Sequence, residues 1–87
     1  MIDLLHLKTF VVVASTKNFN RAAAELGYSQ ASVTHHIKML ERELGARLLE
    51  RFRFSKGADL TEVGRRTYKY ATQILALAER AKSTIRR

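Results

Sequence analysis

The architecture of this chain depends on the sixteen residues Ser29-Gln-Ala-Ser-Val-Thr-His-His-Ile-Lys-Met-Leu-Glu-Arg-Glu-Leu44. Four apolar residues recur in this stretch at spacings of four, three and four: Val33, Ile37, Leu40 and Leu44. On a helix they form one narrow stripe, which we expect to pack inward. The opposite face gathers small, hydrogen-bonding or cationic side chains and no acid: Gln30, Ala31, Thr34, His35, Lys38 and Arg42. The stretch therefore predicts a helix over about 29–44 with a polar face suited to a groove of nucleic acid.

Two shorter helices are predicted before this stretch. The first covers roughly residues 3–16, capped by Asp3, because apolar residues repeat there at helical spacing: Leu4, Leu7, Val11 and Ala14, beside Phe10. The second covers 21–26, and we expect Asn20 to accept the unpaired amides at its start. Gly27 supplies the left-handed residue that ends this helix, and Ser29 caps the next one. Two helices joined by a tight glycine turn are typical of a helix-turn-helix.

A two-stranded wing is predicted after Gly45, which ends the long polar helix. Residues 48–54 are rich in aromatic and branched side chains, 55–57 suit a turn, and 58–60 can form a short return strand. Cations lie on or near the tip of this hairpin: Arg51, Arg53 and Lys56. We expect them at phosphates or in a minor groove, although a solvated basic hairpin is the alternative.

One long helix is predicted from Thr61, a good N-cap, to the last residue. Apolar and small residues alternate there in steps of four and three, as in a coiled-coil seam: Val63, Thr67, Tyr70, Ile74, Leu77, Ala81 and Thr84. A second apolar line broadens the face: Tyr68, Ala71, Leu75 and Ala78. We expect one line to pack on the domain and the other on a second subunit, the alternative being one helix docked on its own core. Residues 1–60 are thus predicted to form a winged helix-turn-helix and residues 61–87 a dimerisation helix.

Composition narrows the classes of protein to consider. A chain of 87 residues forms one small domain with a limited core, so association of subunits is a natural source of further buried surface. The 16 Lys and Arg against 8 Asp and Glu give a net charge of +8, which favours a polyanionic partner. The sequence has no Cys, no apolar run of membrane-spanning length and no signal-peptide pattern, so we expect a cytoplasmic protein that binds no membrane.

An enzyme is the main alternative from another class. The only candidate catalytic or metal-binding side chains that we see are those of His6, His35, His36 and Glu41. Adjacent histidines point about 100° apart on a helix, and no HExxH or thiol pattern accompanies them, so we expect no catalytic residue, metal or cofactor, and His36 should fill the flank of its helix. A second alternative is an interaction module for acidic protein or RNA, which leaves the glycine turn, the polar face and the basic wing unexplained.

Five ordered segments together resemble the amino-terminal domain of LysR-type transcriptional regulators: Phe19-Asn-Arg-Ala-Ala-Ala-Glu-Leu26, residues 29–41, Leu44-Gly45, Leu48-Leu-Glu-Arg51 and Leu60-Thr-Glu-Val-Gly64. The resemblance covers essentially the whole chain. It implies a mainly α-helical winged helix-turn-helix with a two-stranded wing and a long carboxy-terminal linker helix. It also implies sequence-specific binding of double-stranded DNA in bacterial transcription regulation, by homodimers with antiparallel linker helices that form tetramers with an effector domain. That domain is absent from these residues, so we interpret the chain as the DNA-binding portion.

The resemblance also implies roles for individual residues. Four are placed at base edges in the major groove: Gln30, Ala31, Thr34 and His35. Others are placed near the DNA backbone: Ser29, Ser32 and Lys38 on the helix, with Arg51 and Arg53 on the wing. Gln can bond adenine through both amide atoms, and Thr or Ala can cover a thymine methyl group. Gln30 and Ser32 have an alternative role in completing the amino terminus of the helix.

The sequence departs from the family pattern at three places. The family often has Pro where Ala31 stands and usually Arg or Lys where His35 stands, so the strongest guanine contact is weakened or replaced. The wing is slightly longer than usual between Arg51 and Leu60.

Since a dimer presents two recognition helices about one DNA turn apart or more, we expect a roughly palindromic site.

Overall fold

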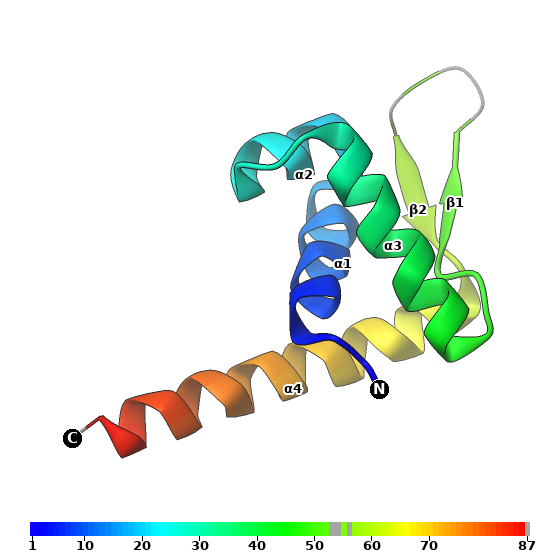
Figure 1. The fold of residues 1–87 in the computed structure, drawn as a ribbon. Helices are drawn as coiled ribbons and strands as arrows, with labels where there is room; N and C mark the ends of the chain where they lie inside the picture. The colour runs from blue at the N-terminus through cyan, green and yellow to red at the C-terminus, as the bar shows by residue number, and fades with distance from the viewer. Residues whose placement is uncertain (53–54, 56, 87) are drawn as a thin grey trace.

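The computed structural model describes residues 1–52, 55 and 57–86. Four helices and two strands follow one another in the order α1 (Leu4–Thr16), α2 (Phe19–Leu26), α3 (Gln30–Leu44), β1 (Leu49–Arg51), β2 (Ala58–Leu60) and α4 (Glu62–Ile85). Figure 1 shows α1 at the centre, with α2 across one end, α3 beside it and α4 running past its other end. The predicted order of helices, wing and long last helix is confirmed.

Each helix begins at a residue whose side-chain oxygen accepts a backbone N–H. Asp3 accepts from Leu5, Ser29 from Ser32 and Thr61 from Gly64, as the sequence predicts. The prediction for α2 is wrong, because Asn18 and not Asn20 is its cap. Asn18 is extended (φ −154°, ψ 120°) and accepts from Arg21 N at 2.9 Å. This earlier start makes Phe19 the first helical residue and buries its ring.

The ends of α2 and α3 are set by glycines in the left-handed conformation. Gly27 has φ 73° and Gly45 has φ 69°, both as the sequence predicts. Tyr28 N donates to Ala23 O at 3.0 Å across the first of these turns. The turn thereby directs the chain from α2 into α3 over only three residues, 27–29.

The core lies where α1, α2 and α3 meet. Its buried members include Leu7, Phe10, Val13, Phe19, Ala22, Ala23, Val33, Ile37, Leu40, Leu48, Leu49, Ala58 and Ala71. The inward stripe of α3 is confirmed for three of its four residues, but Leu44 is 36% exposed at the helix end. In α1, Leu4 is 48% exposed and Val13 is buried instead. The four-residue pattern misjudged α1 because three helices pack around it and bury a wider face than one stripe.

The wing is tied to α1 and α3 at its base. Strands β1 and β2 pair antiparallel, with Arg51 opposite Ala58. The Glu41 carboxylate accepts from Leu48 N at 2.8 Å, and Ala58 N donates to Lys17 O at 3.0 Å. These bonds hold the start of each strand to a helix, so the base of the wing has a fixed position beside α3 (Figure 1).

Helix α4 packs on the domain along one line and leaves the other line uncovered. Ala71 is fully buried, and Tyr68, Leu75 and Ala78 are half-buried. On the seam, Val63 and Thr67 are half-buried, whereas the rest is exposed: Tyr70, Ile74, Leu77, Ala81 and Thr84. The carboxy-terminal turns of α4 extend past the other elements (Figure 1). An apolar surface is therefore available along the outer half of this helix.

Substitution of Gly64 by alanine tests the packing of α4 on the wing. A Cβ at Gly64 would collide with the backbone carbonyl of Leu48, so the first turn of α4 has to move. Although alanine favours an isolated helix, we expect Gly64→Ala to lower the free energy of unfolding by about 2 kcal/mol or more. Denaturant unfolding measures this, with Ser83→Ala in the exposed part of α4 as a control that changes stability by at most about 0.5 kcal/mol. Equal midpoints for Gly64→Ala and the parent chain would contradict the close approach.

Candidate nucleic-acid interface

The outer face of α3 brings the predicted contact residues together. Ala31, His35 and Lys38 are exposed, and Gln30 and Thr34 are half-buried. This face is opposite to Val33, Ile37 and Leu40, which are almost completely buried. The buried stripe thus fixes the rotation of α3, and all five predicted residues are accessible from the same side.

Two predicted backbone contacts lie at the amino terminus of α3. Ser29 Oγ accepts from Ser32 N at 3.1 Å and donates to Ser32 Oγ at 3.1 Å. The alternative role of Ser32 in completing the helix start is therefore present in the structure. Ser29 is exposed and Ser32 is half-buried, so both hydroxyls also border the outer face.

Arg51 joins three elements at the base of the wing. Its Nη2 donates to Thr34 Oγ1 at 2.9 Å, which links β1 to α3. Its guanidinium carbon lies 4.0 Å from the centroid of the Phe19 ring, which belongs to α2. The sequence analysis placed Arg51 at DNA phosphates and missed both contacts. No spacing signal could have revealed them, because Thr34 is 17 residues away and the contact depends on where the wing docks.

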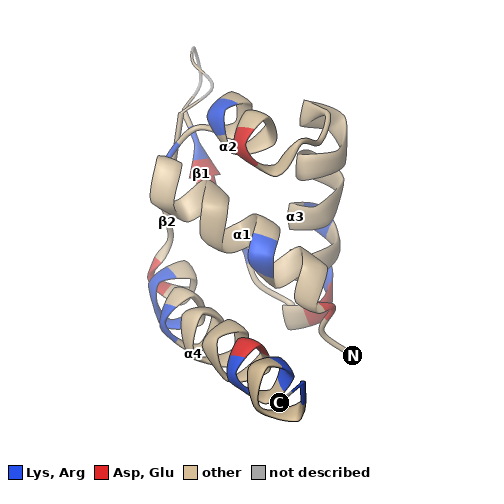
Figure 2. Cartoon of the chain, turned by 90° about the vertical axis from the view of Figure 1, so that its left-hand side faces the viewer, with Lys and Arg blue, Asp and Glu red and all other residues tan. Residues whose placement is uncertain are grey.

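Other cations surround this region. Arg53 and Lys56, both predicted wing contacts, lie outside the described residues. Arg47, which the sequence analysis did not select, lines a surface hollow together with Arg51 and Phe52. Figure 2 shows further basic residues on α1, on α2 and along α4. The positive charge is therefore spread over the molecule, which suits long-range attraction of a polyanion more than it marks one site.

A cluster of aromatic rings fills the junction of α1 and α3. The His36 ring centroid lies 4.9 Å from that of His6 and 5.4 Å from that of Tyr28. His36 Nδ1 is 2.8 Å from Thr9 Oγ1, and this hydroxyl donates to Leu5 O. Thr9 therefore accepts the Nδ1–H of His36, and the ring has the structural role that its position on the helix flank predicts.

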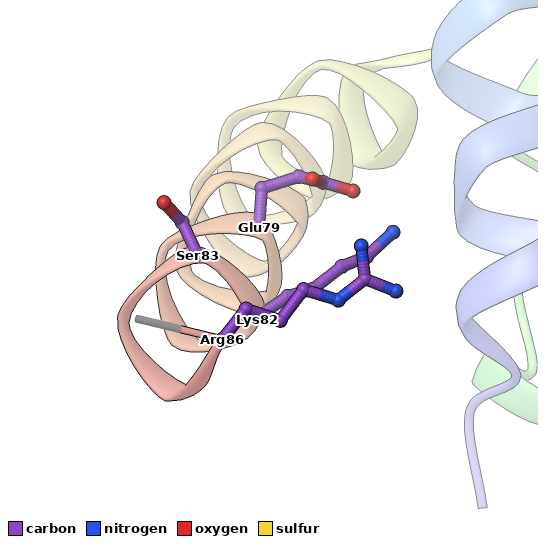
Figure 3. A pocket seen from close by; sticks show the side chains of 4 residues that line it. All are labelled: Glu79, Lys82, Ser83 and Arg86. Carbon is purple, nitrogen blue, oxygen red and sulfur yellow. The ribbon is translucent and has the colours of Figure 1, made fainter.

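No metal site is found within the described part of the chain. No group of three His, Cys, Asp or Glu side chains among these residues could hold a metal ion. A hollow near the end of α4 is lined by Glu79, Lys82, Ser83 and Arg86 (Figure 3). The first three lie on α4, Arg86 is its C-cap, and all four are exposed, so the hollow has no opposing wall. None of the described helices is long and apolar enough to cross a membrane.

The fold and this surface define a winged helix-turn-helix DNA-binding domain. Residues 4–65 match the family described as "Bacterial regulatory helix-turn-helix protein, lysR family". The chain belongs to this LysR family, and the resemblance seen in its sequence motifs is confirmed.

Relatives and solved structures agree with this assignment. The chain is 46% identical over 80 residues to the HTH-type transcriptional regulator BudR of Raoultella terrigena, in an alignment covering 92% of the chain and 27% of that relative. It is similar to the DNA-binding domain of CbnR in a DNA complex, with 37% identity, a TM-score of 0.90, and 97% of this chain and 94% of that chain covered. For the BenM DNA-binding domain with benA site 1 DNA, the values are 35%, 0.89, 98% and 96%. The chain thus spans about a quarter of BudR, which is named as a regulator and not as an enzyme.

The environment of His36 predicts a pH dependence of stability. Burial, followed by the charges of His6 and His35, lowers the pKa of His36 from its usual value of 6.5, while Asp3 opposes the shift. The unfolded chain therefore binds this proton more readily, and stability should fall as pH drops below 6.5. In His36→Gln, we expect the melting temperature to decrease less between pH 7.5 and 5.5 than in the parent chain. His35→Gln removes only one of the smaller causes of the shift and should keep most of the decrease, and an unchanged decrease in His36→Gln would assign it to other groups.

Proposed function

We propose that this chain is the part of a longer LysR-type regulator that binds double-stranded DNA in a sequence-specific way. In this proposal, α3 lies in the major groove and the wing lies at the backbone or in the minor groove. The observation that carries it is the polar and cationic outer face of α3, which the buried Val33, Ile37 and Leu40 hold in one orientation. The acid on the same side of this helix, Glu41, is half-buried and accepts the backbone amides of Leu48 and Leu49. The likeness to two domains solved in complex with DNA supports this placement.

Each residue on this face has a proposed role. Gln30, Ala31, Thr34 and His35 contact base edges in the major groove. Ser29, Ser32, Lys38 and Arg51 contact the DNA backbone, as do Arg53 and Lys56, which lie outside the described residues. Hydrogen bonds to base edges distinguish sequences, whereas contacts to phosphates contribute affinity and register.

The uncovered seam of α4 supports a homodimer. Tyr70 is 65% exposed and Leu77 is 63% exposed, on a helix whose other apolar line already packs on the domain. Two such helices paired through residues 61–87 bury this surface and present two copies of α3 to a roughly palindromic DNA site. With an effector domain attached, the assembly is a tetramer that regulates transcription in the cytoplasm.

Two substitutions on α3 separate base recognition from phosphate binding. We expect Gln30→Ala to relax base preference at one position of each half-site, where the wrong base costs the parent chain about 1–3 kcal/mol. We expect Lys38→Ala to weaken binding to all duplexes alike and to reduce the salt slope by about 1. Selection on randomised duplexes and salt titrations measure both effects. Lys82→Ala, near the far end of α4, is the charge-matched control, and a selected motif that survives Gln30→Ala unchanged would refute the role of Gln30.

A charge on the α4 seam tests the dimer. We expect Leu77→Glu to produce monomers in sedimentation analysis, because each new carboxylate would be buried against the apolar seam of the partner helix. The fold should persist, since Leu77 is exposed in the single subunit. Ala76→Glu adds the same charge at an exposed position off both apolar lines and should remain dimeric. If Leu77→Glu sediments as the parent chain does, the seam is not the dimer interface.

A further inference from the structure

Arg51 is held between two side chains before any DNA is bound. Its guanidinium stacks on Phe19, whose ring is only 2% exposed and therefore fixed in the core. The backbone of Arg51 is paired with that of Ala58, which is completely buried. Because the backbone and the guanidinium group of Arg51 are both held in place, its Nη2–H points in a defined direction and reaches Thr34 Oγ1 at 2.9 Å. An arginine whose only role is to bind a phosphate does not need the contact with Phe19 or the hydrogen bond to Thr34.

The hydroxyl of Thr34 is used differently from those of Thr9 and Thr16. Thr9 and Thr16 donate their hydroxyl hydrogens to the carbonyls four residues earlier, at 3.1 and 2.9 Å. Thr34 Oγ1 instead accepts from Arg51 and, among the described residues, donates to no acceptor. A hydroxyl has one hydrogen and two lone pairs, and a cationic donor occupies a lone pair strongly. The hydrogen of Thr34 is thus left for an acceptor outside the chain.

We propose that Arg51 is a positioning residue that makes Thr34 a hydrogen-bond donor to a base edge. In the major groove, guanine offers O6 and N7, adenine offers N7 and thymine offers O4, whereas cytosine presents its amino donor. Opposite cytosine the hydroxyl hydrogen of Thr34 has no acceptor on the base, so Thr34 favours the other three bases over cytosine at one position of each half-site. This inference rests on the proposed placement of α3 in the major groove.

The competing explanation is that Arg51 acts only through its charge at a phosphate. A guanidinium has five donors, so one N–H can hold Thr34 while others reach a phosphate. Lysine keeps the charge but has neither the planar group that stacks on Phe19 nor the fixed fork of donors. Arg51→Lys consequently separates the two explanations, because only the positioning role requires the guanidinium shape.

The test compares base preferences of Thr34→Val, Thr34→Ser and Arg51→Lys with those of the parent 87-residue chain. Selection on randomised duplexes defines the motif, and titrations with single-base-pair changes measure each preference. We expect the parent chain to disfavour cytosine at one half-site position by about five- to tenfold, the value of one hydrogen bond. Thr34→Val and Arg51→Lys should both lose this preference at that position, and Thr34→Ser should keep it. The double variant Thr34→Val with Arg51→Lys should lose no more of the discrimination against cytosine than either of these single variants.

Three outcomes overturn the inference. Arg51→Lys could weaken all duplexes alike and keep the base profile, which would leave only a charge role. Arg51→Lys could instead relax a base position other than the one that Thr34→Val relaxes. Finally, Thr34→Val could keep the discrimination against cytosine, and this result alone would refute the inference. Thermal melting verifies the fold of each variant. A parent chain that selects no motif refutes the proposed function itself, whereas a motif unchanged in every variant refutes the roles of Thr34 and Arg51 and leaves sequence-specific binding standing.

Discussion

The rotation of α3 about its own axis is the constraint on which the rest of the structure depends. Val33, Ile37 and Leu40 are buried against the other helices, and residues on a helix are separated by about 100°. A slip of one residue in this packing would turn Thr34 and Lys38 away from the open side. The buried stripe thus determines which side chains can reach a partner, although none of its members can touch one.

The same helix also positions the wing. Glu41, one residue after the buried Leu40, accepts backbone amides of Leu48 and Leu49 with a single carboxylate oxygen, at 2.8 and 3.4 Å. Thr34, two turns earlier, accepts from Arg51 at the other end of β1. Since both contacts start on α3, they hold β1 beside this helix at both ends of the strand.

Local signals explain what the sequence predicts well. Caps at Asp3, Ser29 and Thr61 and the pairing of two wing strands depend on residues close together in the chain, and they agree with the structure, although β1 is shorter than the predicted 48–54. The prediction of Asn20 as the cap of α2 was wrong because the start of α2 depends on Phe19, which enters a core built from distant segments. The exposed Leu44 and the Arg51–Thr34 bond likewise depend on where helices and wing dock, which periodicity does not encode.

In the complex proposed above, base preference and half-site spacing are set by different parts of the molecule. Preference is set on α3 and beside β1, where Arg51, Thr34 and Phe19 meet. Spacing is set on α4, whose exposed seam runs beside the line of the buried Ala71. The two parts communicate through a packed junction, in which Gly64 approaches the Leu48 carbonyl so closely that it permits no side chain. Because this junction is closely packed, in the proposed dimer a change in how two α4 helices pair shifts each reading surface together with its own α4 and leaves its base contacts unaltered.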